Sequence, residues 1–290
     1  MPGAMRLPDD PRWLQIAFLG SFLLVGIIAY GVVPAWEPPL TIGAACVTQF
    51  VMARIFRARD AGYLSAIVTG CGLSLLCRSD LTYIPPLAAF LAISSKFLLR
   101  IRGKHIFNPA NFGLVALMLA TPHAWSSPSQ WGERGLLLAW FLLLGLAVVH
   151  RAFRMDITIA FLCAHLLFKG GRILYLGDTL RVLLHQLEVG SLIVFAFFMI
   201  SDPRTTPDRR VGRIAFAFIV AGLGFYLQAF KWIQQGLLYS LFFLSPLVPL
   251  IDRLLPSVRY RWGRPGDAGN SGNERNDACT DLATLPSPSR

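Results

Sequence analysis

The sequence predicts an all-α, polytopic membrane bundle of about ten transmembrane segments. Of its 290 residues 54% are hydrophobic and only 15% are charged, whereas a soluble domain carries about 25% charged residues. The apolar runs are numerous, and several approach the ~20 residues that a helix needs to cross the hydrocarbon core. The net charge of +11 is gathered in short loops between these runs, which indicates membrane topology rather than nucleic-acid binding.

The predicted segments follow one another with basic residues at most of their boundaries. The first segment is too long for the apolar core of a signal peptide, and several later ones are shorter than ~20 residues, so half-helices or re-entrant segments are expected among them. The ten segments are Trp13–Val33, Leu40–Ile55, Ala61–Cys77, Leu81–Leu99, Ile106–Thr121, Gly135–Val149, Ile157–Phe168, Val182–Ile200, Val211–Phe230 and Leu237–Ile251.

The distribution of Lys and Arg predicts the orientation. If the N-terminus is cytoplasmic and all ten segments cross, the inner loops carry 18 of these residues and the outer loops 6, as the positive-inside rule requires. We therefore expect a bacterial cytoplasmic-membrane protein with both termini inside. Residues 1–12 form a short N-terminal segment and 13–251 the membrane domain. Residues 252–290 form a cytoplasmic tail whose Gly, Pro, Ser and Asn content predicts disorder.

Two polar strings interrupt the apolar sequence, GKHIFNPANFG (Gly103 to Gly113) and SDPRTTP (Ser201 to Pro207). In the first, Asn108 is suited to cap a helix and Pro109 to occupy its first turn. The second offers two similar helix starts, at Asp202-Pro203 and at Thr206-Pro207. Polar breaks in matching halves of a membrane protein mark binding sites, and helix N-termini favour anions.

With these motifs, NPAxxG followed much later by DPxTxP, the chain resembles the RnfD/NqrB family over roughly Trp13 to Ile251. The resemblance is to the shorter RnfD-like proteins, of which some are UnbU-like. It implies a ten-helix bundle with an internal repeat, similar to urea transporters. It also implies a flavin, FMN or riboflavin, and electron transfer in a complex with other membrane or membrane-associated redox subunits. In members that attach FMN covalently, a threonine lies in an SGAT-type sequence. Because this chain has no such sequence, we expect a non-covalent flavin.

The candidate cofactor-binding residues come from the two strings. Amide, hydroxyl and guanidinium groups would anchor the flavin or its phosphate, while Lys104 and His105 would stabilise the negative charge that reduction adds. The full set is Lys104, His105, Asn108, Pro109, Asn111, Gly113, Asp202, Arg204, Thr205 and Thr206.

Three other charged residues are weaker candidates for an ion or proton pathway. Glu188 falls within an apolar run, where an unpaired carboxylate is costly. Arg78 and Asp80 lie near the predicted outer interface, where they could simply pair with each other. No catalytic residue, metal site or disulfide framework is predicted, since the five cysteines form no CxxC pair. Two alternative functions stay open: a small-solute or ion transporter on the same fold, and a scaffold subunit without a cofactor.

Overall fold

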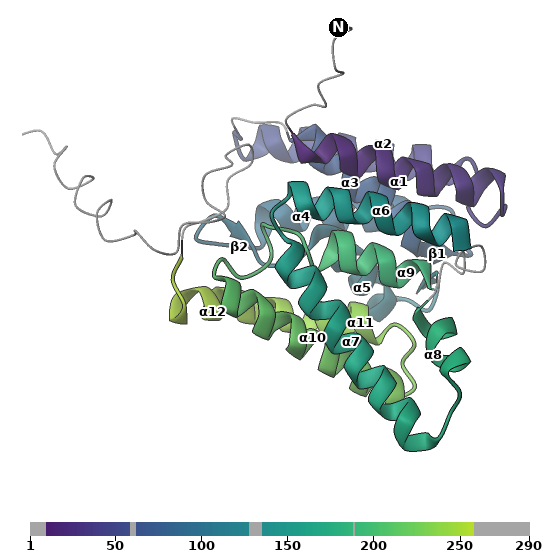
Figure 1. Ribbon diagram of the computed structural model, residues 1–290. Coiled ribbons are helices and arrows are strands. Elements are labelled where there is room, and N and C mark those ends of the chain that lie inside the picture. Colours follow the sequence, from purple (N-terminus) through teal and green to yellow (C-terminus); the bar gives the residue numbers. More distant parts are fainter. Residues whose placement is uncertain (1–9, 59–61, 128–134, 188, 258–290) are drawn as a thin grey trace, which may run out of the picture.

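The computed structural model describes residues 10–58, 62–127, 135–187 and 189–257. The described part is largely helical, with four very short strands (Figure 1). In chain order the elements are α1 (Pro11–Ile28), α2 (Glu37–Ile55), α3 (Tyr63–Leu76), β1 (Cys77–Ser79), α4 (Ile84–Leu98), β2 (Arg100–Ile101), β3 (Lys104–His105), α5 (Pro109–Ala120), β4 (Ala124–Ser126), α6 (Gly135–Arg151), α7 (Met155–Leu176), α8 (Leu180–Leu187), α9 (Gly190–Val194), the π-helix η1 (Phe195–Met199), α10 (Arg210–Phe230), α11 (Gly236–Leu244), the 3-10 turn η2 (Ser245–Leu247) and α12 (Val248–Leu254).

Each of the ten predicted segments contains a helix, although some are interrupted. The eighth segment is divided into α8 and the α9–η1 helix, which meet at a bend of 57°. The tenth is divided by the η2 turn. Within the described residues, three helices are long and apolar enough to cross a membrane, or four if the bent pair is one span. A span count of ten and the likeness to urea transporters stay predictions.

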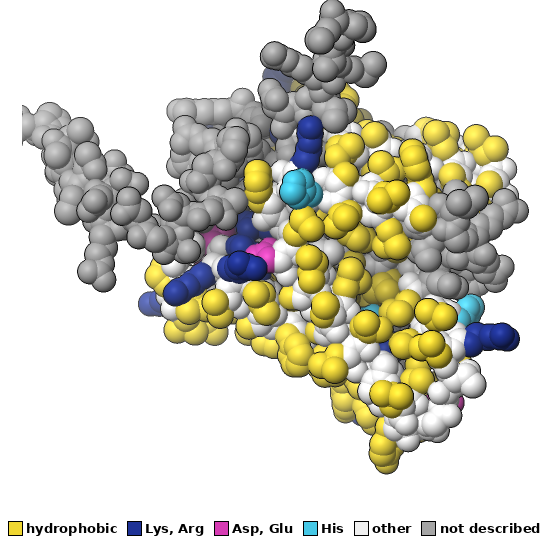
Figure 2. Space-filling view, viewed as in Figure 1, with side chains coloured by type: hydrophobic (Ala, Val, Ile, Leu, Met, Phe, Trp, Pro, Cys, Tyr) yellow, Lys and Arg dark blue, Asp and Glu magenta, His cyan; other side chains and the backbone are white. Residues whose placement is uncertain are grey.

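The surface agrees with a membrane protein. Large apolar side chains are exposed along the outward faces of the helices, among them Leu143, Leu167 and Ile214. Figure 2 shows hydrophobic side chains over most of one face, with charged side chains concentrated toward its ends. Such a surface is stable in lipid and would aggregate in water.

Helix α7 is longer than its predicted segment. The sequence-based prediction, which ends the segment at Phe168 and places Lys169 and Arg172 in an outer loop, is wrong because the helix continues to Leu176. Long basic side chains can lie along an apolar helix with only the charged head in a polar region. The guanidinium of Arg172 is 5.4 Å from the ring centroid of Phe230, a cation–π contact that accommodates it there.

Close packing of α4 and α5 fixes the end of the first polar string. A Cβ on Gly113 would clash with the carbonyl oxygen of Ala88, so only glycine allows this approach. Just before α5, a hairpin joins β2 and β3, in which Arg100 pairs with His105. Its two-residue turn, Arg102-Gly103, has positive φ angles of 51° and 78°, as a tight type I′ turn requires. The hairpin places Lys104 and His105 beside the end of α4.

Candidate functional site

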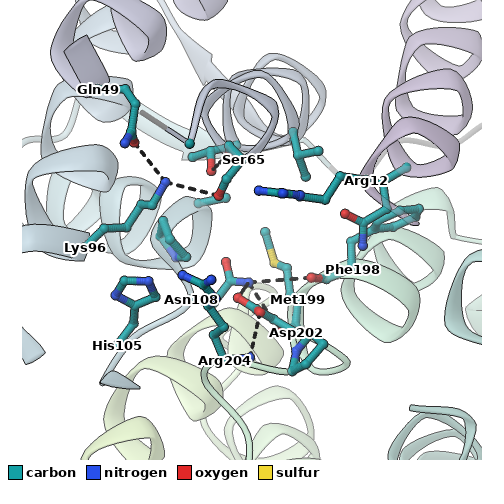
Figure 3. A pocket seen from close by; sticks show the side chains of 18 of the residues that line it. Arg12, Gln49, Ser65, Lys96, His105, Asn108, Phe198, Met199, Asp202 and Arg204 are labelled. Carbon is teal, nitrogen blue, oxygen red and sulfur yellow. Dashed lines mark hydrogen bonds between the residues drawn. The ribbon is translucent and has the colours of Figure 1, made fainter. Parts of the chain in front are cut away.

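The two polar strings meet at one cavity. It has a volume of about 400 Å³ and is lined by residues from α1, α3, α4, the β2–β3 hairpin, the start of α5, and the η1 helix with the loop that follows it. His105, Asn108 and Pro109 line it from the first string, and Asp202, Pro203 and Arg204 from the second (Figure 3). Small-molecule sites occupy roughly 300–1,000 Å³, so the volume suits a small ligand.

Asn108 connects the strings. Its Oδ1 accepts a hydrogen bond of 3.1 Å from the backbone N–H of Asn111 and caps α5, with Pro109 in the first turn. This confirms the predicted helix start. Its Nδ2 makes long contacts of 3.4–3.5 Å with the carbonyl oxygens of Phe198 and Met199 and with Oδ2 of Asp202. One amide side chain therefore orients both the α5 start and the end of η1.

The second string forms a turn rather than a helix start. Oδ1 of Asp202 accepts from the backbone N–H of Arg204 at 3.0 Å, and the helix begins only at Arg210. Both helix starts predicted in SDPRTTP are therefore wrong. The physical reason is that an aspartate side chain can cap its own turn, while Pro207 disfavours helical geometry in the residue before it.

Lys104 joins the second string to α12 instead of lining the cavity. Its Nζ donates to the carbonyl oxygen of Thr206 at 2.5 Å, to Oδ1 of Asp208 at 3.0 Å and to Oδ2 of Asp252 at 2.7 Å. The backbone N–H of Asp208 also donates to Oδ1 of Asp252 at 2.8 Å. We call Lys104, Asp208 and Asp252 the lysine clamp. Burial raises the pKa of Asp208 even though Lys104 acts to lower it.

Four further predicted residues support the site without lining the cavity. Nδ2 of Asn111 donates to the carbonyl oxygen of Leu238 at 3.2 Å and so ties α5 to α11. Gly113 allows α5 to approach α4. The hydroxyls of Thr205 and Thr206 bond back to the carbonyl oxygen of Asp202, at 3.5 and 2.9 Å. They stabilise the turn that carries Arg204.

Lys96 is a cavity residue that lies outside both predicted strings. It is near the end of α4, is only 6% exposed and lines the cavity. Its Nζ donates to Oε1 of Gln49 at 3.0 Å and to Oγ of Ser65 at 3.1 Å, both neutral acceptors (Figure 3). The sequence does carry a signal for Lys96, which is a lysine inside an apolar run. An ionisable residue at membrane depth indicates a functional site by default.

His105 is buried with one ring nitrogen unsatisfied. The residue is 7% exposed, and its Nδ1 has no hydrogen-bond partner among the described residues. Burial lowers the pKa of His105 to about 3, and the positive charges of Arg100 and Lys96 act in the same direction. The imidazole is therefore neutral at pH 7 and can give or accept a hydrogen bond within the cavity.

Asp202 is the carboxylate of the cavity wall. Burial raises its pKa above the usual range, although the backbone N–H and the charge of Arg204 act to lower it. Around it, the apolar part of the wall includes Leu19, Val68 and Phe198. The cavity thus combines apolar surfaces, neutral hydrogen-bonding groups and charged groups, as small-molecule sites do.

The candidate ion-pathway residues lie apart from this cavity. Arg78 pairs with Glu37 of α2, Nη1 to Oε1 at 2.9 Å, and Asp80 pairs with Nδ1 of His123 at 2.8 Å. The expected pairing of Arg78 with Asp80 is therefore wrong, because each reaches a partner from another element. Glu188 lies outside the described residues.

Comparison with known proteins gives consistent matches. Residues 129–261 match the model of the NQR2, RnfD, RnfE family. One component of the proton-translocating ferredoxin:NAD(+) oxidoreductase complex of Clostridium ljungdahlii is 25% identical over 86% of this chain and 90% of its own length. Components of ion-translocating oxidoreductase complexes from two other bacteria match over shorter stretches. The protein from Tolumonas auensis is 36% identical over 26% of this chain and 22% of its own length. The protein from Stutzerimonas stutzeri is 26% identical over 52% of this chain and 41% of its own length.

Proposed function

Starting from a chain that belongs to the RnfD family of membrane subunits, we propose that it relays electrons through a flavin bound non-covalently in the cavity between the two polar strings. The observation that carries the proposal is the meeting of these strings, about ninety residues apart, around one cavity. Residues so distant in sequence converge on a polar cavity at the cost of burying charge, which favours a binding function.

The residues present fit a flavin. Its ring system needs flat apolar surfaces and hydrogen-bonding groups at its edge. Val68 and Phe198 supply apolar surface, and Asn108 and the unsatisfied Nδ1 of His105 supply polar groups. When bound, the flavin would supply the redox chemistry, and the protein would supply position and electrostatics.

Each part of the wall has a distinct task in this proposal. Asn108 and His105 orient the ring through hydrogen bonds, and Lys96 and Arg204 compensate the negative charge that arrives with an electron. The lysine clamp holds the second string in place, so Lys104 acts on this charge only at longer range. The apolar wall excludes water, which strengthens each of these electrostatic interactions.

The proposed function also includes an orientation in the membrane and redox partners. With the N-terminus in the cytoplasm, the cavity lies at the cytoplasmic side, where it would receive electrons from a redox subunit and pass them toward a membrane or extracytoplasmic acceptor. The relatives belong to proton- or ion-translocating oxidoreductase complexes, so we propose that this chain also works with other redox subunits.

The test is to purify the full chain in detergent, record its absorption spectrum and assay an acid extract for FMN and riboflavin. We expect a yellow protein whose flavin is released by acid. Asn108→Ala and Arg204→Gln should lower the flavin content, while Arg181→Gln, an exposed arginine of α8, should not. A colourless protein that binds no added flavin would refute the proposal, and flavin fluorescence retained on a denaturing gel would refute the non-covalent attachment.

A further inference from the structure

A second cavity lies between the C-terminal halves of α7 and α10. The two helices pack against each other (Figure 1), and the cavity between them has a volume of about 590 Å³. Most of its wall is apolar. The rings of Phe168 and Phe225 stack there across the helix pair with their centroids 5.7 Å apart, and Leu167 and Leu176 add aliphatic surface. We call this cavity the α7–α10 groove, and no described residue lines both it and the cavity of the two polar strings.

Two basic residues of α7 lie at the groove. Arg172 lines it, and Lys169 is one turn earlier on the same helix, close enough for the two charges to repel each other. Both residues are half-buried. Within the described part of the chain neither side chain makes a hydrogen bond or an ion pair, and Arg172 contacts only the ring of Phe230. Because uncompensated charge in a membrane helix is costly, this pair of cations favours an anionic ligand.

Aromatic residues indicate the depth of these cations in the membrane. Tyr175 and Trp232 both line the groove and are 88% and 81% exposed. Tyrosine and tryptophan gather at the level of the lipid headgroups, and Tyr175 is only one turn beyond Arg172. In the proposed orientation this is the extracytoplasmic side, where membrane topology disfavours basic residues. Lys169 and Arg172 therefore need a reason other than topology, and a headgroup phosphate at the same depth supplies one.

We propose that the α7–α10 groove binds an anionic phospholipid, with its phosphate held by Arg172 and Lys169 and one acyl chain lying along Phe168 and Phe225. Basic pockets between membrane helices bind anionic headgroups, and the planar guanidinium of arginine matches the oxygens of a phosphate. A zwitterionic lipid brings its own cation and leaves the two charges uncompensated. Free phosphate would leave the apolar wall uncovered, and an apolar helix of a partner subunit would leave the charges unpaired. The site does not depend on the flavin.

The test uses phospholipids with brominated acyl chains, which quench tryptophan fluorescence on contact. The full chain, purified in a neutral detergent, is titrated with brominated phosphatidylglycerol or brominated phosphatidylcholine. Trp232 is the reporter because it lines the groove. We expect part of the fluorescence to be quenched at a concentration of phosphatidylglycerol about fivefold or more below that of phosphatidylcholine. Trp232→Phe should remove this part of the quenching, and its persistence would place the lipid elsewhere and overturn the proposal.

Charge substitutions test the headgroup contacts. Arg172→Gln and Lys169→Gln should each raise the required concentration of phosphatidylglycerol about fivefold while leaving that of phosphatidylcholine within about twofold. Arg209→Gln is the matched control, because it removes an exposed arginine from the opposite end of α10. Equal quenching by the two lipids, or quenching by phosphatidylglycerol that neither α7 substitution weakens, would overturn the proposal.

Filling the groove tests the contact with the acyl chain. Gly171 lines the groove, and a Cβ added there would meet nothing within 4 Å, so Gly171→Leu should fold and occupy the space while both cations remain. It should weaken the binding of phosphatidylglycerol about fivefold or more, and unchanged binding would overturn the placement of the lipid in the groove. Gly20→Leu is the matched control, because nothing lies within 4 Å of a Cβ added to that glycine of α1 either. If a charge variant fails to fold, Gly171→Leu decides the matter.

Discussion

Removing the cation of the lysine clamp should destabilise the protein measurably. In Lys104→Met the aliphatic stem is largely kept, but the ammonium that bonds Thr206, Asp208 and Asp252 is lost. Asp208 and Asp252 then face each other with no cation between them. The loop of the second string and α12 would separate, although neither the cavity-lining side chains nor the apolar core has been changed.

The magnitude follows from burial. Breaking a fully buried ion pair costs about 3–5 kcal/mol because a charge is left uncompensated, whereas exposed pairs contribute about 0–1 kcal/mol. The side chains of Lys104, Asp208 and Asp252 are 14%, 7% and 18% exposed, which is closer to the buried limit. We therefore expect Lys104→Met to lower the free energy of unfolding by about 2–4 kcal/mol.

The assay is unfolding by SDS in mixed micelles, followed by circular dichroism. Lys104→Met/Asp252→Asn should recover part of the loss, about 1–2 kcal/mol, because one of the two opposed carboxylates has become neutral. Lys231→Met is the matched control and should unfold like the wild type. An unfolding curve for Lys104→Met that overlays the wild type, or a double variant less stable than the single one, would refute this account of the clamp.

Three further predictions concern the site and its support. Gly113→Ala should destabilise the protein by about 1–3 kcal/mol through overpacking, since the added Cβ would meet the backbone oxygen of Ala88. Gly20→Ala is the control, because a Cβ added there would meet nothing within 4 Å, and it should leave the stability unchanged or raise it. Similar effects of the two substitutions in the same unfolding assay would contradict the packing argument. Asn108→Ala should lower the free energy of unfolding by about 0.5–2 kcal/mol because α5 loses its cap, and it should also reduce the flavin content. A variant that is destabilised but keeps its full flavin content would show that Asn108 caps α5 without binding the flavin. Because the pKa of His105 is lowered to about 3 in the folded protein from an ordinary value of 6.5, only the unfolded chain takes up a proton there between these values. Stability should therefore fall on acidification through this range, by at most about 1.4 kcal/mol per pH unit, and an identical pH profile in His105→Gln would exclude His105 as the cause.

The sequence predicted the parts of the site whose chemistry is local. Asn108 followed by Pro109 is a strong helix-start signal, and α5 begins there as expected. The same reasoning failed at Asp202, because an aspartate before proline can equally close a turn, and only the packing against Asn108 and the lysine clamp decides between the two. Lys96 and Arg12 lie outside both polar strings. Their convergence depends on how α1 and α4 pack, which no short motif encodes.

The π-helical turn at Phe195–Met199 has a consequence for how this chain can vary in length. In it the backbone N–H of Ile200 bonds to the carbonyl oxygen of Phe195, five residues earlier, so the turn contains one more residue than an α-helical path would use. Deleting a single residue such as Ala196 would let the turn close as an ordinary α-helix and would leave the residues beyond it in nearly the same phase, because the α-helical path uses one residue fewer. What the deletion would change is the turn itself, where the carbonyl groups of Phe198 and Met199 meet Asn108. A one-residue deletion is therefore expected to disturb the rest of the second string less here than in a regular α-helix, where it would rotate everything beyond it by about 100°.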